Sequence, residues 1–141
     1  MSDPINAMER SEADEPEGLW TTRFMLFLRV MAAVSLLKGL YHWALIIGIG
    51  QGPFSAFETS STAWQAATMY FSVIDLVAAV GLWLAAAWGG VVWLTATISM
   101  VAIELLFPQV YGGRILVILV EVAMLGAYFT LAIAAARERP D

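Results

Sequence analysis

Residues 24–49 read FMLFLRVMAAVSLLKGLYHWALIIGI, and this apolar run decides the class of protein. An α-helix rises about 1.5 Å per residue, so roughly 20 apolar residues cross the ~30 Å of hydrocarbon in a bilayer. Three further apolar runs follow at residues 64–87, 91–107 and 115–136. We therefore predict an all-α protein, an antiparallel four-helix transmembrane bundle.

The composition of the whole chain agrees with a membrane protein. Of its 141 residues, 60% are hydrophobic and only 13% are charged, and a soluble domain of this size needs far more polar surface. Residues 1–22 are predicted to form a disordered, acidic cytoplasmic tail, because they cannot bury enough apolar area to offset chain entropy. The four spans then occupy a single transmembrane domain at residues 23–137, which leaves no room for a separate soluble catalytic domain.

Several kinds of site are excluded by residue type. The chain has no cysteine, which excludes thiolate catalysis, disulfide exchange and Cys-ligated metal centres. Its single histidine, His42, cannot supply the two imidazoles of a bis-histidine haem. No Ser/His/Asp set, metal-ligand spacing, phosphate loop or basic patch is present. We therefore expect no enzymatic activity, no cofactor, no metal and no nucleic-acid partner.

Positive charge predicts the orientation of the spans. The loop at residues 50–63 contains no Lys or Arg, and the loop at 108–114 contains only Arg114. Lys and Arg gather on the cytoplasmic side of membrane proteins, so we predict that both termini are cytoplasmic (N-in/C-in). The residues that carry this prediction are Arg10, Arg23, Arg29, Arg137 and Arg139.

Local signals predict where the helices begin and end. Thr62 and Gln65 have the spacing of a capping box that opens the second helix. The glycines at 89–90 can adopt the left-handed conformation that ends a helix and allows a tight hairpin. Pro108 and the glycines at 112–113 are expected to separate the third helix from the fourth.

Every span carries an ionisable residue well inside it. They are Lys38 in the first span, with His42 at its outer end, Asp75 in the second, Glu104 in the third and Glu121 in the fourth. Counting from the helix ends places Lys38, Glu104 and Glu121 in one layer of the outer half, with Asp75 about a turn below and His42 above. Charges in lipid are costly, so these side chains must face one another or a partner protein.

The charge balance of this set predicts an internal ion pair. One lysine against three carboxylates leaves a net charge that a low-dielectric interior does not tolerate. We expect Lys38 to pair with either Glu104 or Glu121, and at least one other carboxyl group to carry a proton near neutral pH.

Three further residues have alternative interpretations. His42, between Tyr41 and Trp43, is either an interfacial aromatic anchor, which we favour, or a proton acceptor or quinone-headgroup donor. Arg29 is expected to reach phosphate headgroups rather than join the charged set. Arg114 either binds anionic headgroups or pairs with Glu104.

The segment from Gly81 to Leu116 resembles a family of short four-span inner-membrane proteins of alphaproteobacteria whose function is unassigned. The similarity covers about a quarter of the chain and implies the fold and a location in a bacterial cytoplasmic (inner) membrane. The residues that carry it are Trp83, Trp88, Gly89, Trp93, Phe107, Pro108, Tyr111, Gly112 and Arg114.

Two functions fit the intramembrane charges. The first is an accessory or interaction subunit of a larger inner-membrane complex, whose partners, besides the lipid bilayer, are another membrane protein or further copies of this chain. The alternative is a small proton- or cation-coupled transporter that uses Glu104, Glu121 or Asp75 as the exchanging carboxylate. The absence of proline inside the spans weighs against the discontinuous helices of many transporters.

Overall fold

The protein is helical throughout the part of the chain that its structure describes. The computed structural model describes residues 18–50 and 56–138 and, apart from these, Pro4 alone, so most of the acidic segment 1–22 lies outside the described residues. The long helices are α2 (Leu19–Ile47), α4 (Thr62–Trp83), α5 (Ala87–Leu106) and α7 (Ile115–Arg137), and the short ones are α3 (Ala56–Thr59) and α6 (Pro108–Tyr111). No strand occurs in these residues. All four long helices are long and apolar enough to cross a membrane, so the predicted all-α class is confirmed.

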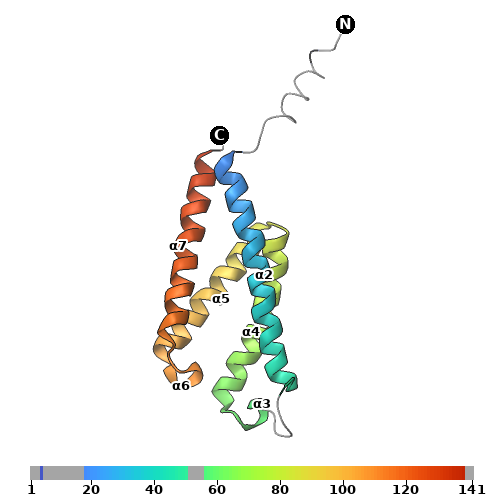
Figure 1. Ribbon diagram of the computed structural model, residues 1–141, viewed down its shortest axis with the longest axis vertical. Coiled ribbons are helices and arrows are strands. Elements are labelled where there is room, and N and C mark those ends of the chain that lie inside the picture. Colours follow the sequence, from blue (N-terminus) through green and yellow to red (C-terminus); the bar gives the residue numbers. More distant parts are fainter. Residues whose placement is uncertain (1–3, 5–17, 51–55, 139–141) are drawn as a thin grey trace.

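Consecutive long helices run in opposite directions (Figure 1). The start of α2 and the end of α7 lie at one end of the molecule, which we call the terminal end, and α3 and α6 lie at the other, the loop end. Helix α2 packs against α4 and α7, and α5 packs against the same two helices. The predicted antiparallel four-helix arrangement is therefore confirmed.

Two predicted helix boundaries were wrong. The cap of α4 is Ser61 rather than Thr62, because the Ser61 hydroxyl accepts the hydrogen bond from the Trp64 backbone N–H. Helix α5 already begins at Ala87, so the glycines at 89–90 lie inside it rather than in the turn. The left-handed residue of the α4–α5 turn is Ala85, with φ +52°.

The glycines of α5 serve close packing instead. A Cβ atom on Gly89 would overlap the backbone of Gly81, so the two helices touch through their main chains. A Cβ on Gly90 would lie only 2.7 Å from the Tyr128 hydroxyl. Because residues 89 and 90 have no side chains, α4 can pack closely on one side of α5 and α7 on the other. Local sequence signals do not reveal this need for close packing.

The interior changes character between the two ends. Its terminal half is apolar, with Leu28, Met31, Ala32, Ala78, Leu82 and Trp93 forming one buried cluster. The loop half contains the buried polar residues Ser35, His42, Thr68, Ser72, Asp75, Glu104 and Glu121. The buried charges of the bundle therefore lie in its loop half, away from the apolar core that the four helices share.

Helix α7 is the most weakly enclosed of the four. Only 6% of its most apolar window is buried, against 28% or more in each of the other three helices. Tyr128 attaches it to the apolar core, with ring centroids 5.7 Å from Phe24 and 5.3 Å from Trp93. At the terminal end, the Glu138 carboxylate accepts hydrogen bonds of 3.0 Å from the backbone N–H groups of Trp20 and Thr21.

Candidate functional site

Four buried or half-buried ionisable side chains meet in the loop half of the bundle: Lys38, His42, Asp75 and Glu121, which we call the charge cluster. Lys38 Nζ donates a 2.8 Å hydrogen bond to Glu121 Oε1 and lies 3.9 Å from Asp75 Oδ1. His42 Nδ1 lies 3.8 Å from Asp75 Oδ2. The cluster therefore joins three helices, α2, α4 and α7, through one lysine.

Helical spacing explains why these side chains converge. Lys38 and His42 are four residues apart and share one face of α2. On α4, Thr68, Ser72 and Asp75 follow at steps of four and three, and each is at most 1% exposed. This buried polar stripe turns Asp75 toward α2, because lipid cannot satisfy polar groups on the outer face of the bundle.

His42 belongs to the cluster rather than to the membrane surface. Its Nδ1 lies 2.8 Å from the Lys38 backbone carbonyl, which can only accept, so Nδ1 carries a hydrogen. The ring stacks on Phe71, with the centroids 5.7 Å apart, and the residue is only 5% exposed. The favoured interpretation of His42 as an interfacial aromatic anchor was therefore wrong, because the ring packs against Phe71 of α4 inside the bundle.

The charge cluster is short of one positive charge. With His42 neutral, one ammonium group faces two carboxylates, which leaves a formal net charge of −1. Within the part of the chain that the structure describes, Asp75 Oδ2 and Glu121 Oε2 are buried oxygens without a hydrogen-bond partner, as is Thr97 Oγ1. Buried acceptors of this kind carry a free-energy cost until a proton, a cation or a hydrogen-bond donor reaches them.

Glu104 forms a separate ion pair and does not contact Lys38 within hydrogen-bonding range. The Arg114 side chain donates to Glu104 Oε1 from Nε at 3.0 Å and from Nη2 at 2.9 Å, and its backbone N–H donates to Oε2 at 2.8 Å. Glu104 is 2% exposed, whereas the Arg114 side chain is half-exposed. Of the two alternatives for each residue, the structure therefore joins Lys38 to Glu121 and Arg114 to Glu104.

Arg29 lies outside the charge cluster. Its guanidinium group sits 4.8 Å from the centroid of the Trp83 ring, in the terminal half of the bundle. The residue is exposed, and its place on α2 turns it away from Lys38. Arg29 therefore contributes a cation–π contact between α2 and α4 rather than a charge in the site.

Two cavities lead to the charge cluster. The loop-end cavity, of about 370 Å³, is lined by Tyr41, His42, Leu45, Trp64, Val110, Tyr111, Gly112 and Arg114. The lateral cavity, of about 510 Å³, lies between α2 and α7 and is lined by Val34, Lys38, Tyr41, His42, Met100, Arg114, Leu116, Val117, Val120, Glu121 and Met124. Three residues, Tyr41, His42 and Arg114, line both, so the cavities adjoin at the edge of the cluster.

Tyr111 of α6 lines the loop-end cavity. Its hydroxyl lies 3.1 Å from Thr68 Oγ1, which ties α6 to α4. Burial raises the pKa of the Tyr111 phenol from its ordinary value of 10.0, against the opposing effect of this hydrogen bond. The phenol therefore stays protonated in the physiological range and acts as a neutral hydrogen-bonding group.

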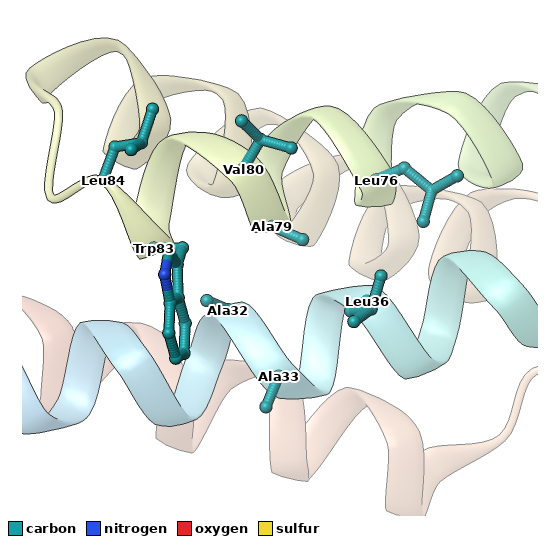
Figure 2. A pocket seen from close by; sticks show the side chains of 8 residues that line it. All are labelled: Ala32, Ala33, Leu36, Leu76, Ala79, Val80, Trp83 and Leu84. Carbon is teal, nitrogen blue, oxygen red and sulfur yellow. The ribbon is translucent and has the colours of Figure 1, made fainter.

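A third hollow lies on the other side of α2 and is apolar (Figure 2). This groove, of about 530 Å³, separates α2 from α4 where Ala32, Ala33 and Ala79 leave a gap that Trp83 and Leu84 border at one end. No titratable side chain lines it. The groove is similar in volume to the lateral cavity but, unlike it, has no titratable group in its wall.

The sequence did not indicate two parts of this arrangement. Val117 and Val120 line the lateral cavity but look like any other lipid-facing residues of a span. Glu138 caps the start of α2 from the far end of the chain. An acidic residue at a helix C-terminus opposes the helix dipole, and that mismatch was the one available signal for its role.

The side chains of the charge cluster are titratable groups. In residues 18–50 and 56–138, no group of three His, Cys, Asp or Glu side chains is arranged to hold a metal ion. The carboxylates of Asp75 and Glu121 can instead take up and release a proton, with Lys38 and His42 beside them as further titratable groups.

Comparison with known proteins identifies a protein family. A family model described as "Family of unknown function (DUF6163)" matches residues 22–139, which include the charge cluster and the Glu104–Arg114 pair. Neither the curated proteins nor the solved structures provide a match to this chain.

Proposed function

The chain belongs to the family of unknown function DUF6163, and from its own site we propose that it is a small proton-linked cation exchanger of a membrane. The observation that carries the proposal is the charge cluster, in which two buried carboxylates share one lysine and each keeps one oxygen without a hydrogen-bond partner among the described residues. The proposal involves no catalytic step.

The charge balance supports exchange rather than a purely structural role. A pair fully satisfied within the bundle would need one carboxylate for one lysine, and the second carboxylate adds a cost that packing alone does not offset. One proton or one monovalent cation neutralises the cluster. Because either can do so and both together would leave an excess positive charge, their binding is mutually exclusive, which is the basis of coupled exchange.

The attachment of α7 supports a conformational response to protonation. In the loop half, this helix is joined to α2 through Lys38 and Glu121 and to α5 through the Arg114–Glu104 pair. A proton on Glu121 weakens its ion pair with Lys38, and α7 has little buried apolar surface to hold it in place. Protonation therefore changes how firmly α7 closes the lateral cavity.

Proton flux in liposomes tests the proposal. The full-length protein is reconstituted with a pH-sensitive dye inside the vesicles, and an outward gradient of one monovalent cation (Na⁺, K⁺ or the organic cation tetraethylammonium) is imposed in each experiment. We expect cation-dependent movement of protons that Glu121→Gln abolishes. The matched control is Glu138→Gln, which makes the same chemical change outside the charge cluster and should leave the flux intact.

Two results would overturn this function. One is a flux no larger than that of protein-free vesicles with any of the three cations. The other is equal flux from the parent protein and from Glu121→Gln, since the cluster would then play no part in the movement of protons.

The proposed location is a bacterial inner membrane with both termini in the cytoplasm. Arg23, Arg29 and Arg137 lie toward the terminal end, whereas the loop end has Arg114 as its one Lys or Arg among the described residues. This distribution follows the positive-inside bias. In this orientation the loop-end cavity opens toward the periplasm.

A second candidate function is that of an accessory subunit of a membrane complex, and the exposure of α7 favours it. With 6% of its most apolar window buried, this helix leaves nearly its whole outer face for lipid, a partner helix or a second copy of the chain. Purification of the tagged protein from native membranes in mild detergent tests this function. A stoichiometric partner would support it, and a monomeric protein without partners would contradict it.

A further inference from the structure

The walls of the lateral cavity are those of a site for a lipophilic molecule. Its volume of about 510 Å³ falls within the range of roughly 300–1,000 Å³ that is usual for small-molecule sites. Most of its lining is apolar, with Val34, Val117, Val120 and Leu116 among the aliphatic residues. Leu116 is 74% exposed and Val120 is 48% exposed, so the cavity opens sideways onto the lipid-facing flank of the bundle.

The inner end of the same cavity is charged. Lys38 and Glu121 line it, and the unpartnered oxygen Oε2 belongs to Glu121, whose side chain is only 5% exposed. The formal charge of −1 on the cluster favours a positive head over a neutral or anionic one. An anionic lipid headgroup at this position would meet two carboxylates for one ammonium.

The remaining lining groups suit a large, weakly hydrated cation. The thioethers of Met100 and Met124 are polarisable, and the aromatic ring of Tyr41 is also among the lining side chains. A small inorganic cation would gain little from these groups, because it is better solvated by water or carboxylate oxygens. Apolar walls and soft side chains thus point to an organic cation.

From these features we infer that the lateral cavity takes a lipophilic monovalent cation from the membrane, in exchange for a proton on the charge cluster. The inference rests on the proposed exchange function and names its substrate class. The cation enters between α2 and α7, its charge lies near Glu121 Oε2, and its apolar groups remain against the valines and methionines of the cavity wall.

The expected pH dependence follows from the groups that face Glu121. Lys38 and His42 approach from α2 and Asp75 from α4, while Arg114 lines the same cavity and is itself paired with Glu104 of α5. A proton on either carboxylate of the cluster raises its charge from −1 to 0, and protonation of His42 would raise it further. Each of these steps weakens the attraction for a cation, so acidification must lower its affinity.

Binding of tetraphenylphosphonium to the full-length protein in nonionic detergent, followed by equilibrium dialysis, tests the inference. We expect saturable binding that is about tenfold or more weaker at about pH 5 than at about pH 8, because an ordinary imidazole group, with a pKa of about 6.5, gains its proton between these values. Glu121→Gln should lose most of the affinity at about pH 8, because the cluster then lacks its formal negative charge.

A pair of cavity-filling variants locates the site and does not depend on the fate of Glu121→Gln. Val120→Phe fills the lateral cavity, and Val80→Phe makes the same change in the apolar groove of Figure 2, where Val80 is 56% exposed. We expect Val120→Phe to weaken binding by about tenfold or more, as loss of a well-packed site does, and Val80→Phe to leave it unchanged.

Each contrary outcome has a distinct meaning. Absence of saturable binding at about pH 8, equal effects of the two phenylalanine variants, or an affinity independent of pH would each overturn the inference. Proton flux driven by Na⁺ or K⁺ without binding of tetraphenylphosphonium would overturn it while leaving the proposed exchange of inorganic cations intact. Binding with the expected pH dependence but without any flux would instead overturn the proposed exchange function.

Discussion

Lys38 and Glu121 are 83 positions apart in the sequence and form a hydrogen-bonded ion pair of 2.8 Å that joins α2 to α7. These are the first and the last of the long helices, and they pack against each other. Two further contacts hold α7 in place. Tyr128 packs against Trp93 in the apolar half, and Glu138 accepts a hydrogen bond from Trp20 at the terminal end. The ion pair of Lys38 and Glu121 depends on the protonation of a buried carboxylate, which links the site to the packing of a whole helix.

Removal of the lysine should destabilise the bundle more than removal of the pair. Lys38→Met leaves Glu121 and Asp75 buried without a counter-charge, and breaking a buried pair in this way costs about 3 kcal/mol or more. The double variant Lys38→Met with Glu121→Met should cost less, because one carboxylate goes with the ammonium. Thermal unfolding in detergent, followed by tryptophan fluorescence, measures both. A double variant less stable than Lys38→Met would contradict the pairing.

Arg114→Ala should destabilise the protein more than Glu104→Gln. The first change leaves a buried carboxylate with only the backbone N–H of residue 114, and a lost hydrogen bond to a charged group is worth roughly 1.5–3 kcal/mol. A glutamine at 104 needs no counter-charge and its amide oxygen still accepts that backbone N–H. The apparent melting temperatures of the two variants in the same detergent give the comparison, and the reverse order would show that Glu104 does not depend on Arg114.

The contact between α4 and α5 should tolerate no side chain. A Cβ on Gly89 overlaps the Gly81 backbone, so Gly89→Ala is expected to cost about 1–3 kcal/mol through forced separation of the helices. Gly126→Ala is the matched control, because no atom lies within 4 Å of the added Cβ and the position is also inside a helix. The two variants are compared by thermal unfolding and by yield from membranes. Equal stability would mean that α4 and α5 do not approach this closely.

The hydrogen bonds that Glu138 accepts from the first residues of α2 should be lost in acid. Hydrogen bonds from the backbone N–H groups of Trp20 and Thr21 and from the Thr21 hydroxyl hold the pKa of Glu138 below its ordinary value of 4.5, with the Trp20 bond the largest cause. A carboxyl group whose pKa falls on folding stabilises the folded state above its ordinary pKa, and this stabilisation is lost as the pH falls through the lowered value.

The variant Glu138→Ala measures this contribution. We expect a small decrease in melting temperature at neutral pH, where the carboxylate is charged, and no difference from the parent protein in strong acid, where the carboxyl group is protonated. A difference that persists unchanged into strong acid would show that the side chain acts by packing and not through its charge.

The four long helices could be predicted because the signal for each is local. Apolar runs in the sequence correspond to α2, α4, α5 and α7, whose ends differ from the expected spans by a few residues. The predictions failed where a second helix decides the role of a residue. The glycines at 89–90 were interpreted as a turn signal, whereas they lie inside α5 and admit the backbone of α4 and the hydroxyl of Tyr128.

Four of the five residues that the sequence was expected to bring together lie in the charge cluster, but Glu104 does not, and the pairing of the charges could not be predicted. Spacing along α2 and α4 places Lys38 and Asp75 on inward faces whatever the neighbouring helices are. Lys38 was left with two possible partners, Glu104 and Glu121, since both were expected at the same depth. The structure joins it to Glu121, while Glu104 pairs with Arg114 only ten residues away across the α5–α7 turn.

The amino-acid sequence alone determined that this chain forms four apolar helices with a layer of charge inside them. Hydropathy and helical periodicity are properties of single segments, and the cost of exposing charge to lipid turns each polar stripe inward. Only the tertiary structure decided which charges meet, where the cavities open and how Glu138 binds the start of α2. These depend on the rotation and tilt of each helix against its neighbours, which side-chain packing between distant segments sets.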